Sequence, residues 1–268
     1  MTRLLVALLV FFGATFGQNR AQAQFIKSIA VPEARTFTTD ESGNIYVLRG
    51  KNELVRFDNN GDSTGFFRSV SNGEVSWIDA TNPLRIMLYY QAFSKIVLLD
   101  RMLAPKNELD LKKLSIYNPS ATGISADGKI WVYDFVNARL KKIDDQLNTN
   151  LTSNDMRMET QVVPAPTSLI EKEYKIYACD SAQGIFTFDR FGGYINTLEI
   201  MGVSKMQVVG KQLIYLKGDT LQAYDLQSFE LKKMPLPGST EDLIDARVER
   251  NRLFILYKNR LDIYQQND

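Results

Sequence analysis

The feature that most constrains this chain is a repeated pair of short apolar runs. Each first run is rich in β-branched and aromatic residues, and six copies recur about every 40 residues. They occupy residues 44–48, 85–89, 129–133, 175–179, 212–216 and 252–256. A unit of this size cannot bury its own apolar surface, so neighbouring copies must pack against one another.

A second apolar run follows each first run after a few polar residues. These second runs cover residues 54–58, 96–100, 140–144, 185–189, 221–225 and 261–265. Five of the six end on aspartate, and the sixth ends on Gln265. Turn residues such as Gly43 and Gly128 directly precede first runs, which is typical of short strands joined by hairpins. Since no amphipathic helical stretch interrupts the pattern, an all-β fold is predicted.

The third unit contains the residues that most clearly resemble a known repeat family. Residues 124–134 read ISADGKIWVYD, followed by NARL at 137–140 and ID at 143–144. This resembles the NHL-type β-propeller repeat, whose pattern is D-x-x-G-x-I-Y-V-x-D, then N-x-R and a hydrophobic-x-x-F-D. Residues 40–58 are similar, although Arg49 stands where the family has its aspartate, and units two, five and six keep only the apolar skeleton.

The resemblance implies an all-β fold, a six-bladed β-propeller. It implies little about activity, because propellers serve as binding modules, scaffolds and enzymes alike. The last unit has room for three strands only, whereas the other units have room for four. Residues 25–32 form an apolar run with no local partner, and we expect them to complete the sixth blade and remove its free edge. A frayed N-terminal arm is the alternative.

The first 23 residues have the pattern of a secretory signal peptide. Arg3 precedes an apolar stretch at residues 4–16, and Ala21-Gln22-Ala23 forms a small-x-small cleavage site. Residues 24–268 are then predicted to form a single propeller domain, exported to a periplasm or secreted. An uncleaved anchor is the alternative. No later segment approaches the length of a membrane span, so none is expected after cleavage.

The charge balance argues against some partners. Removing Arg3 and Arg20 from 32 basic residues leaves 30, against 31 acidic residues. A nearly neutral surface lacks the basic excess that nucleic acid or an anionic membrane requires. Cys179 is the only cysteine, so it forms no intrachain disulfide, and a buried thiol is expected.

The chain contains no histidine. Without histidine, catalysis by a Ser-His-Asp or Cys-His arrangement is excluded, and so are the usual metal sites with imidazole ligands. We therefore predict no catalytic residue, no metal site and no cofactor. Lactonase-like six-bladed propellers hold calcium with oxygen ligands at the central opening, so an enzyme of that kind using Asp134, Asn137 or Asp180 stays open as an alternative.

A ring of polar and aromatic residues is the candidate binding site. In a propeller, the loop after the second strand of each blade opens on the same face as the blade-to-blade connections. The corresponding positions carry Arg49, Tyr90, Asp134, Asp180, Lys217 and Tyr257. Two cations, two anions and two tyrosines favour a recognition surface over a calcium cage. The alternative is that the aspartates cap turns and the cations are solvated. Trp77 and Trp131 are expected to fill the core, with a sugar-stacking platform as the alternative.

These observations lead to one principal hypothesis of function and two alternatives. The principal hypothesis is an exported, non-enzymatic scaffold that binds another envelope protein, in the manner of the propeller subunit of outer-membrane assembly machinery. The first alternative is a propeller that binds a small molecule or glycan in its central funnel. The second is the calcium-dependent, lactonase-like hydrolase.

Overall fold

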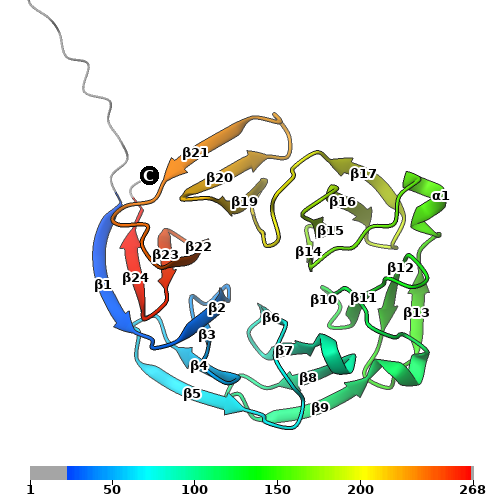
Figure 1. Cartoon of the computed structure of the whole chain (residues 1–268), viewed down its shortest axis with the longest axis horizontal. Helices are drawn as coiled ribbons and strands as arrows, with labels where there is room; N and C mark the ends of the chain where they lie inside the picture. Colours follow the sequence, from blue (N-terminus) through cyan, green and yellow to red (C-terminus); the bar gives the residue numbers. More distant parts are fainter. Residues whose placement is uncertain (1–22, 267–268) are drawn as a thin grey trace, which may run out of the picture.

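The computed structural model describes residues 23–266, and the predicted signal peptide lies outside the described residues apart from Ala23. Within this range, strands β1 to β24 form six four-stranded antiparallel sheets around one central axis (Figure 1). The protein is therefore a six-bladed β-propeller, as predicted from the repeats.

Three blades lie in the first half of the chain. Blade 1 contains β2 (Ala34–Thr39), β3 (Ile45–Arg49), β4 (Glu53–Phe57) and β5 (Ser63–Arg68). Blade 2 contains β6 (Trp77–Asn82), β7 (Arg85–Tyr90), β8 (Lys95–Leu99) and β9 (Pro105–Asp110). Blade 3 contains β10 (Ala121–Ile124), β11 (Ile130–Asp134), β12 (Arg139–Ile143) and β13 (Thr149–Thr152).

The second half supplies the other three. Blade 4 contains β14 (Ser168–Lys172), β15 (Lys175–Asp180), β16 (Gly184–Asp189) and β17 (Tyr194–Leu198). Blade 5 contains β18 (Gln207–Val209), β19 (Gln212–Lys217), β20 (Thr220–Asp225) and β21 (Leu231–Pro235). Blade 6 contains β22 (Leu243–Glu249), β23 (Arg252–Tyr257), β24 (Arg260–Gln265) and β1 (Gln24–Ala30).

Short helices occur only in the connections of the described part of the chain. They are the 3-10 helices Gln91–Phe93 and Leu111–Leu114 and the α-helix α1 (Met156–Thr160). None of the helices between residues 23 and 266 has the length and hydrophobicity needed to cross a bilayer.

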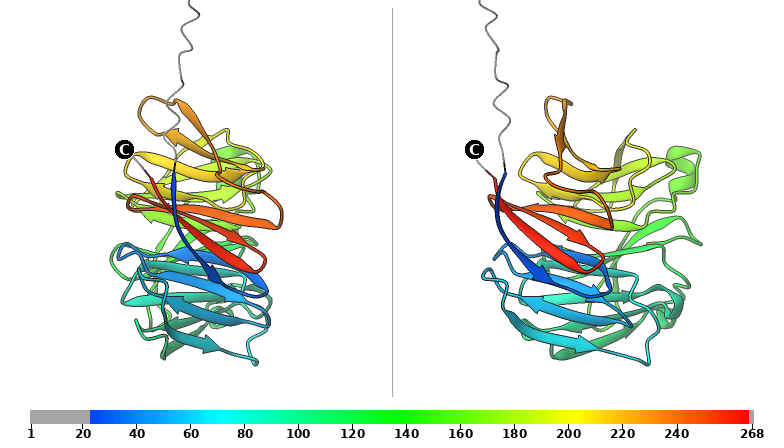
Figure 2. Two further views of the ribbon diagram at one scale, coloured as in Figure 1. Left: turned by 90° about the vertical axis from the view of Figure 1, so that its left-hand side faces the viewer. Right: turned by 60° about the vertical axis from the view of Figure 1, so that its left-hand side comes forward.

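The ring is closed by the N-terminal strand. Strand β1 pairs antiparallel with β24, from Gln24 opposite Gln265 to Ala30 opposite Arg260. The ring of Phe25 meets that of Tyr264 edge-on, with centroids 5.4 Å apart. Figure 2 shows β1 in blue beside β24 in red at the rim of the disc. The predicted closing strand is confirmed, and the edge of β24 is covered.

The hydrophobic core is divided into six clusters, one between each pair of neighbouring blades. Each radial sheet is consequently buried on both faces. In β11, for example, every side chain from Ile130 to Tyr133 is fully buried. A strand covered on both faces reads as a continuous apolar run rather than an alternating one, which explains the pattern of the first runs.

The repeated aspartates shape the turn between the third and fourth strands. The Asp189 carboxylate accepts hydrogen bonds from the backbone amides of Phe191 at 2.8 Å and Gly193 at 2.9 Å. Asp58, Asp100 and Asp144 likewise accept hydrogen bonds from the backbone amides two and four residues further along the chain. Asp225 accepts from the amides two and three residues further along. Blade 6 takes its fourth strand from the N-terminus and makes no such turn. Gln265 can therefore replace the aspartate there.

Candidate functional site

The loops of this propeller are divided between two faces. Ala121 at the start of β10 pairs with Tyr133 near the end of β11, so the loop after β11 lies beside the point where the chain enters blade 3. We define the connection face as the side that holds the blade-to-blade connections and the loops between second and third strands. The opposite face holds the remaining turns.

Two of the predicted site residues, Tyr90 and Tyr257, are buried between blades. Tyr90 has no exposed surface and packs between blades 1 and 2, and burial raises its pKa to about 12. Tyr257 packs between blades 5 and 6, and the guanidinium carbon of Arg260 lies 3.9 Å from its ring centroid. The two rings thus belong to separate parts of the core.

The two predicted aspartates cap loops. Asp134 accepts hydrogen bonds from the backbone and side-chain amides of Asn137 and forms an ion pair with Lys141 at 2.7 Å. Burial acts to raise the pKa of Asp134, but the bonds from Lys141 and Asn137 outweigh it and hold the pKa below its ordinary value. Asp180 accepts from the backbone amides of Ala165, Ala182 and Gln183.

The two predicted cations lie at different places on the connection face. Arg49 forms an ion pair with Glu53 at 2.6 Å, and Lys217 donates to the carbonyl oxygen of Met201 at 3.1 Å. The six predicted residues therefore do not form one cluster. A role for any of them in ligand binding stays a prediction.

Cys179 is buried, as expected. Its thiol donates to the carbonyl oxygen of Val203 at 3.1 Å, and burial raises its pKa to about 12. The thiolate needed for nucleophilic chemistry is consequently disfavoured at neutral pH.

A small hollow lies beside the innermost strands. This channel cavity has a volume of about 210 Å³. It is lined by Arg35, Thr36, Phe37, Thr38, Leu48, Val75, Ser76, Trp77, Ile78, Lys205 and Arg247. Three of these residues are cationic and none is acidic, so the lining is rich in hydrogen-bond donors.

Arg247 is the most unusual of these residues. It lies on the innermost strand β22, and its guanidinium makes no hydrogen bond or ion pair with any residue from 23 to 266; its Nε is shielded from solvent. Burial lowers the pKa of Arg247, while the charges of Asp245, Glu249 and Asp79 oppose that shift. Arginine stays protonated in proteins, so Arg247 places a positive charge on the innermost strand of blade 6, beside the cavity.

Two further donors belong to the same cavity. The Lys205 ammonium donates to the Thr36 hydroxyl at 2.7 Å and lies 3.7 Å from a carboxylate oxygen of Asp245. The indole nitrogen of Trp77 is shielded from solvent and finds no acceptor in the described part of the chain. The cavity therefore presents donors from blades 2 and 6 and from the connection into blade 5.

The nearby carboxylate of Asp79 already has partners. It is only 4% exposed, and it accepts from the amide of Ile124 at 2.7 Å and from the amide and hydroxyl of Thr81 at 2.9 and 2.7 Å. Burial raises the pKa of Asp79, although these hydrogen bonds and Arg247 counteract it. Asp79 joins blades 2 and 3 and does not line the cavity.

A larger hollow opens on the connection face. This mouth groove has a volume of about 490 Å³. Its lining comes from blades 2 to 4 and consists of Ser76, Trp77, Tyr89, Gln91, Asn118, Ser120, Phe135, Ala165, Pro166 and Thr167. Ser76 and Trp77 line both hollows, so the channel cavity and the mouth groove adjoin each other.

Large apolar side chains are also exposed on the connections and loops of this face. They are Val70, Phe93, Tyr117, Phe135, Val136, Met158, Val162, Val163 and Met201, which we call the apolar rim. All belong to the connection face by their positions in the chain. Val70 and Met158 are the most exposed of them, each with 83% of its surface accessible.

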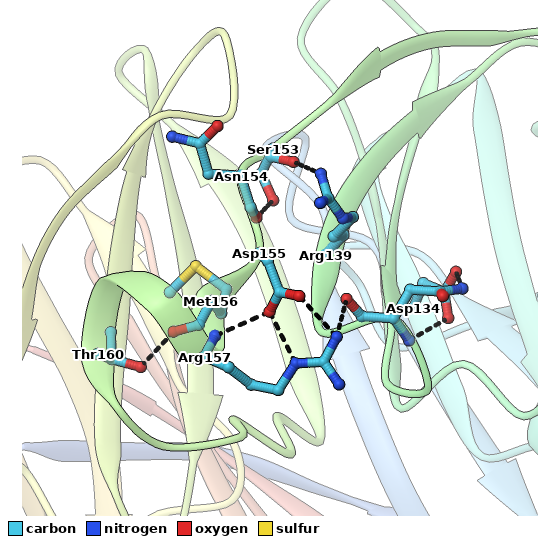
Figure 3. A network of polar contacts seen from close by, with 9 residues as sticks. Asp134, Arg139, Ser153, Asn154, Asp155, Met156, Arg157 and Thr160 are labelled. Atoms are coloured by element: carbon cyan, nitrogen blue, oxygen red, sulfur yellow. Dashed lines mark hydrogen bonds and ion pairs between the residues drawn. The ribbon is translucent and has the colours of Figure 1, made fainter.

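Helix α1 holds part of the apolar rim in place. Figure 3 shows Asp155, the residue that caps this helix, accepting from the amide of Arg157 at 3.0 Å and from its guanidinium at 2.6 and 2.8 Å. Arg157 also reaches the carbonyl oxygen of Asn137 at 3.4 Å, which ties the helix to the loop of blade 3. The hydrogen bonds and charge of Arg157 lower the pKa of Asp155 to about 2.

The sequence reasoning missed the cationic residues of the channel cavity. A signal was present, because Asp245, Arg247 and Glu249 alternate with Ala246 and Val248 in the first strand of the last unit. Charges at alternate positions of an innermost strand lie on one side of it. No group of three or more aspartate, glutamate, cysteine or histidine side chains is close enough to hold a metal ion anywhere in residues 23–266.

Comparison with known proteins supports the fold alone. No protein-family model and no curated protein matches this sequence. A catalytically inactive histidine-to-alanine variant of virginiamycin B lyase from Staphylococcus aureus, solved with quinupristin, is similar in structure with a TM-score of 0.63 at 10% identity, over 90% of this chain and 99% of that chain.

Two other solved propellers resemble this structure to a comparable extent. The propeller domain of Cps50 (Swd1) from Myceliophteria thermophila has a TM-score of 0.63 at 10% identity, covering 92% of this chain and 100% of that chain. The Pan2 WD40 domain from Neurospora crassa has a TM-score of 0.60 at 10% identity, covering 92% and 96%. Such low identities define a fold that many functions share.

Proposed function

We propose that this protein is an exported, NHL-like, non-enzymatic propeller that binds a partner protein of the cell envelope through its connection face. The observation that carries the proposal is the exposed apolar rim of the connection face, of which Phe135 also lines the mouth groove. Export rests on the signal-peptide pattern of residues 1–23.

The composition of this surface suits a protein partner. Phe135 and Val136, 39% and 61% exposed, follow Asp134 in the loop of blade 3, and Phe135 also lines the mouth groove. Extended exposed apolar surface is uncommon on monomers and marks interaction sites. Gln91 and Asn118 add hydrogen-bonding groups, and interfaces combine an apolar centre with such polar groups.

The loops that carry the apolar rim are held by internal bonds. Asp134 fixes the loop of blade 3 through Asn137 and Lys141, and Asp155 caps α1. A surface that is ordered before binding loses less conformational entropy on association. Asp134, one of the six predicted site residues, thus helps to hold the loop that carries Phe135 and Val136.

Catalysis of the kind found in the lyase has little support here. The inactive lyase variant lacks one histidine, and the present chain has no histidine at all. A calcium-dependent mechanism requires clustered oxygen ligands, among which carboxylates are usual, and residues 23–266 contain no group of three or more Asp and Glu side chains close enough to hold a metal ion.

Site-specific photo-cross-linking in the native envelope tests the proposal. A photoreactive amino acid replaces Phe135 or Met158 on the connection face, and Leu84 or Phe191 on the opposite face as matched controls. We expect one discrete cross-linked product from the first pair and none from the second. Absence of any product from Phe135 and Met158, or equal products from both faces, would overturn the proposal.

A further inference from the structure

We propose that the channel cavity is a binding site for a small organic acid, whose carboxylate is held by Arg247, Lys205 and the indole N–H of Trp77. The proposal goes beyond partner binding at the connection face and does not depend on it. It rests on three observations: donors without acceptors, a cation without an ion pair and a small space with an apolar wall.

The first observation is the set of donors. Within the described residues, the guanidinium Nε of Arg247 and the indole nitrogen of Trp77 are shielded from solvent and have no hydrogen-bond acceptor. Buried polar groups are almost always paired, so unpaired donors around one cavity indicate a missing acceptor. A guanidinium binds a carboxylate through two parallel hydrogen bonds, which makes a carboxylate the best-fitting acceptor.

The second observation is charge. Arg35, Lys205 and Arg247 line the cavity and no acidic residue does. Two of the surrounding carboxylates are bonded to other groups, Asp79 to Ile124 and Thr81 and Glu249 to Thr39. Glu74 pairs with Arg35 at 3.1 Å and Asp245 with Lys205 at 3.7 Å. Among the described residues, Arg247 is therefore the lining cation without an ion pair. Charges partly screened from water interact strongly, so this lining favours an anion.

The third observation is size and shape. The cavity of about 210 Å³ is smaller than typical sites for drug-sized ligands. Phe37, Leu48, Val75 and Ile78 supply the apolar part of the cavity wall. A nucleotide or glycan is too large for this space, whereas an acid of a few carbon atoms fits. The hydroxyls of Thr36, Thr38 and Ser76 can contact a second polar group on such an acid.

The two tryptophans provide a direct readout. Trp131 is fully buried and bonded to Glu171, and Trp77 lines the cavity. In a Trp131→Phe variant, Trp77 is the only tryptophan and its emission reports the cavity. The purified protein is titrated with acetate, propionate, succinate and inorganic phosphate at constant ionic strength. Thermal melting of the unsubstituted protein serves as a second readout.

We expect a saturable change in Trp77 emission and a rise in melting temperature with at least one carboxylate. Lys205→Gln and Arg247→Lys should each weaken binding about tenfold, because each removes a charged hydrogen bond. Lys232→Gln, on the exposed outer strand of blade 5, is the matched control and should bind normally. Circular dichroism checks that each variant is folded. If the Arg247→Lys protein is not folded, the binding measurement on the Lys205→Gln protein is enough to test the proposal.

Three outcomes would overturn the proposal. They are no saturable response to any carboxylate, saturation by phosphate alone, and undiminished binding in folded Lys205→Gln protein. A double variant, Phe135→Ser with Val136→Ser, separates this site from the connection face. It should lose the partner protein and keep the acid, so failure of one proposal leaves the other measurable.

Discussion

Gln207 and Val248 are joined by two hydrogen bonds across the interface between blades 5 and 6. The Gln207 amide nitrogen donates to the Val248 carbonyl at 2.7 Å, and its carbonyl accepts from the Val248 N–H at 2.8 Å. The side-chain amide of glutamine carries the same kind of donor and acceptor as a peptide group. It therefore pairs with the N–H and C=O of Val248 on the inner edge of β22, as a further strand would. Asp79 does the same for one amide, that of Ile124 in blade 3.

Replacing Gln207 by alanine should destabilise the propeller by about 2 kcal/mol, because it leaves the buried N–H and C=O of Val248 without partners. Urea denaturation followed by circular dichroism measures the loss. Gln212→Ala, at an exposed position of β19, should change stability by less than about 0.5 kcal/mol. Equal effects of the two substitutions would contradict the bridging role.

Closure of the ring depends on the side of β1 that faces the core. Ile29 packs against the cluster between blades 6 and 1, whereas its neighbour Ser28 is exposed. Ile29→Asn should therefore lower the free energy of unfolding by about 1 to 2 kcal/mol through lost apolar burial, and Ser28→Asn should leave it nearly unchanged. Thermal melts at several protein concentrations test both, since a loosened β1 exposes the edge of β24 and promotes association.

The repeated aspartates should contribute to stability at their turns. Asp189→Ala removes the acceptor of the Phe191 and Gly193 amides and should cost about 1 kcal/mol, a modest value because water can reach these groups. Asp62→Ala is the control, since the Asp62 carboxylate is exposed and accepts no hydrogen bond from any residue of the described range. A larger loss at Asp62 than at Asp189 would rule out the proposed turn function.

Acid should weaken the loop held by Asp134. Because its folded pKa lies below the ordinary value of 3.8, the ionised form is stabilised by folding. That contribution is complete above the unfolded pKa and is lost as the pH falls from about 3.8 through the lower folded pKa. Asp134→Asn should therefore be less stable than the parent at pH 7, and the difference should shrink in acid. A difference independent of pH would exclude the ionised carboxylate as its cause.

The candidate ring of six residues was less predictable than the fold. The aligned positions lie at or just after the ends of second strands, one strand further from the axis than the innermost strands. Tyr90 and Tyr257 are therefore enclosed between blades, while Asp134 and Asp180 cap loops. The sequence pattern identified the correct end of each strand but not the direction of each side chain.

The sequence by itself determined the number of blades, the short strands that form them and the closing role of the segment at residues 25–32. These properties follow from local patterns, because apolar runs and turn residues repeat in every blade. Only the tertiary structure decided that Arg247, Lys205 and Trp77 share one cavity, since they come from blade 6, a connection and blade 2. Residues so distant in the chain become neighbours only when the ring closes, and the packing of the innermost strands then sets which donors lack an acceptor.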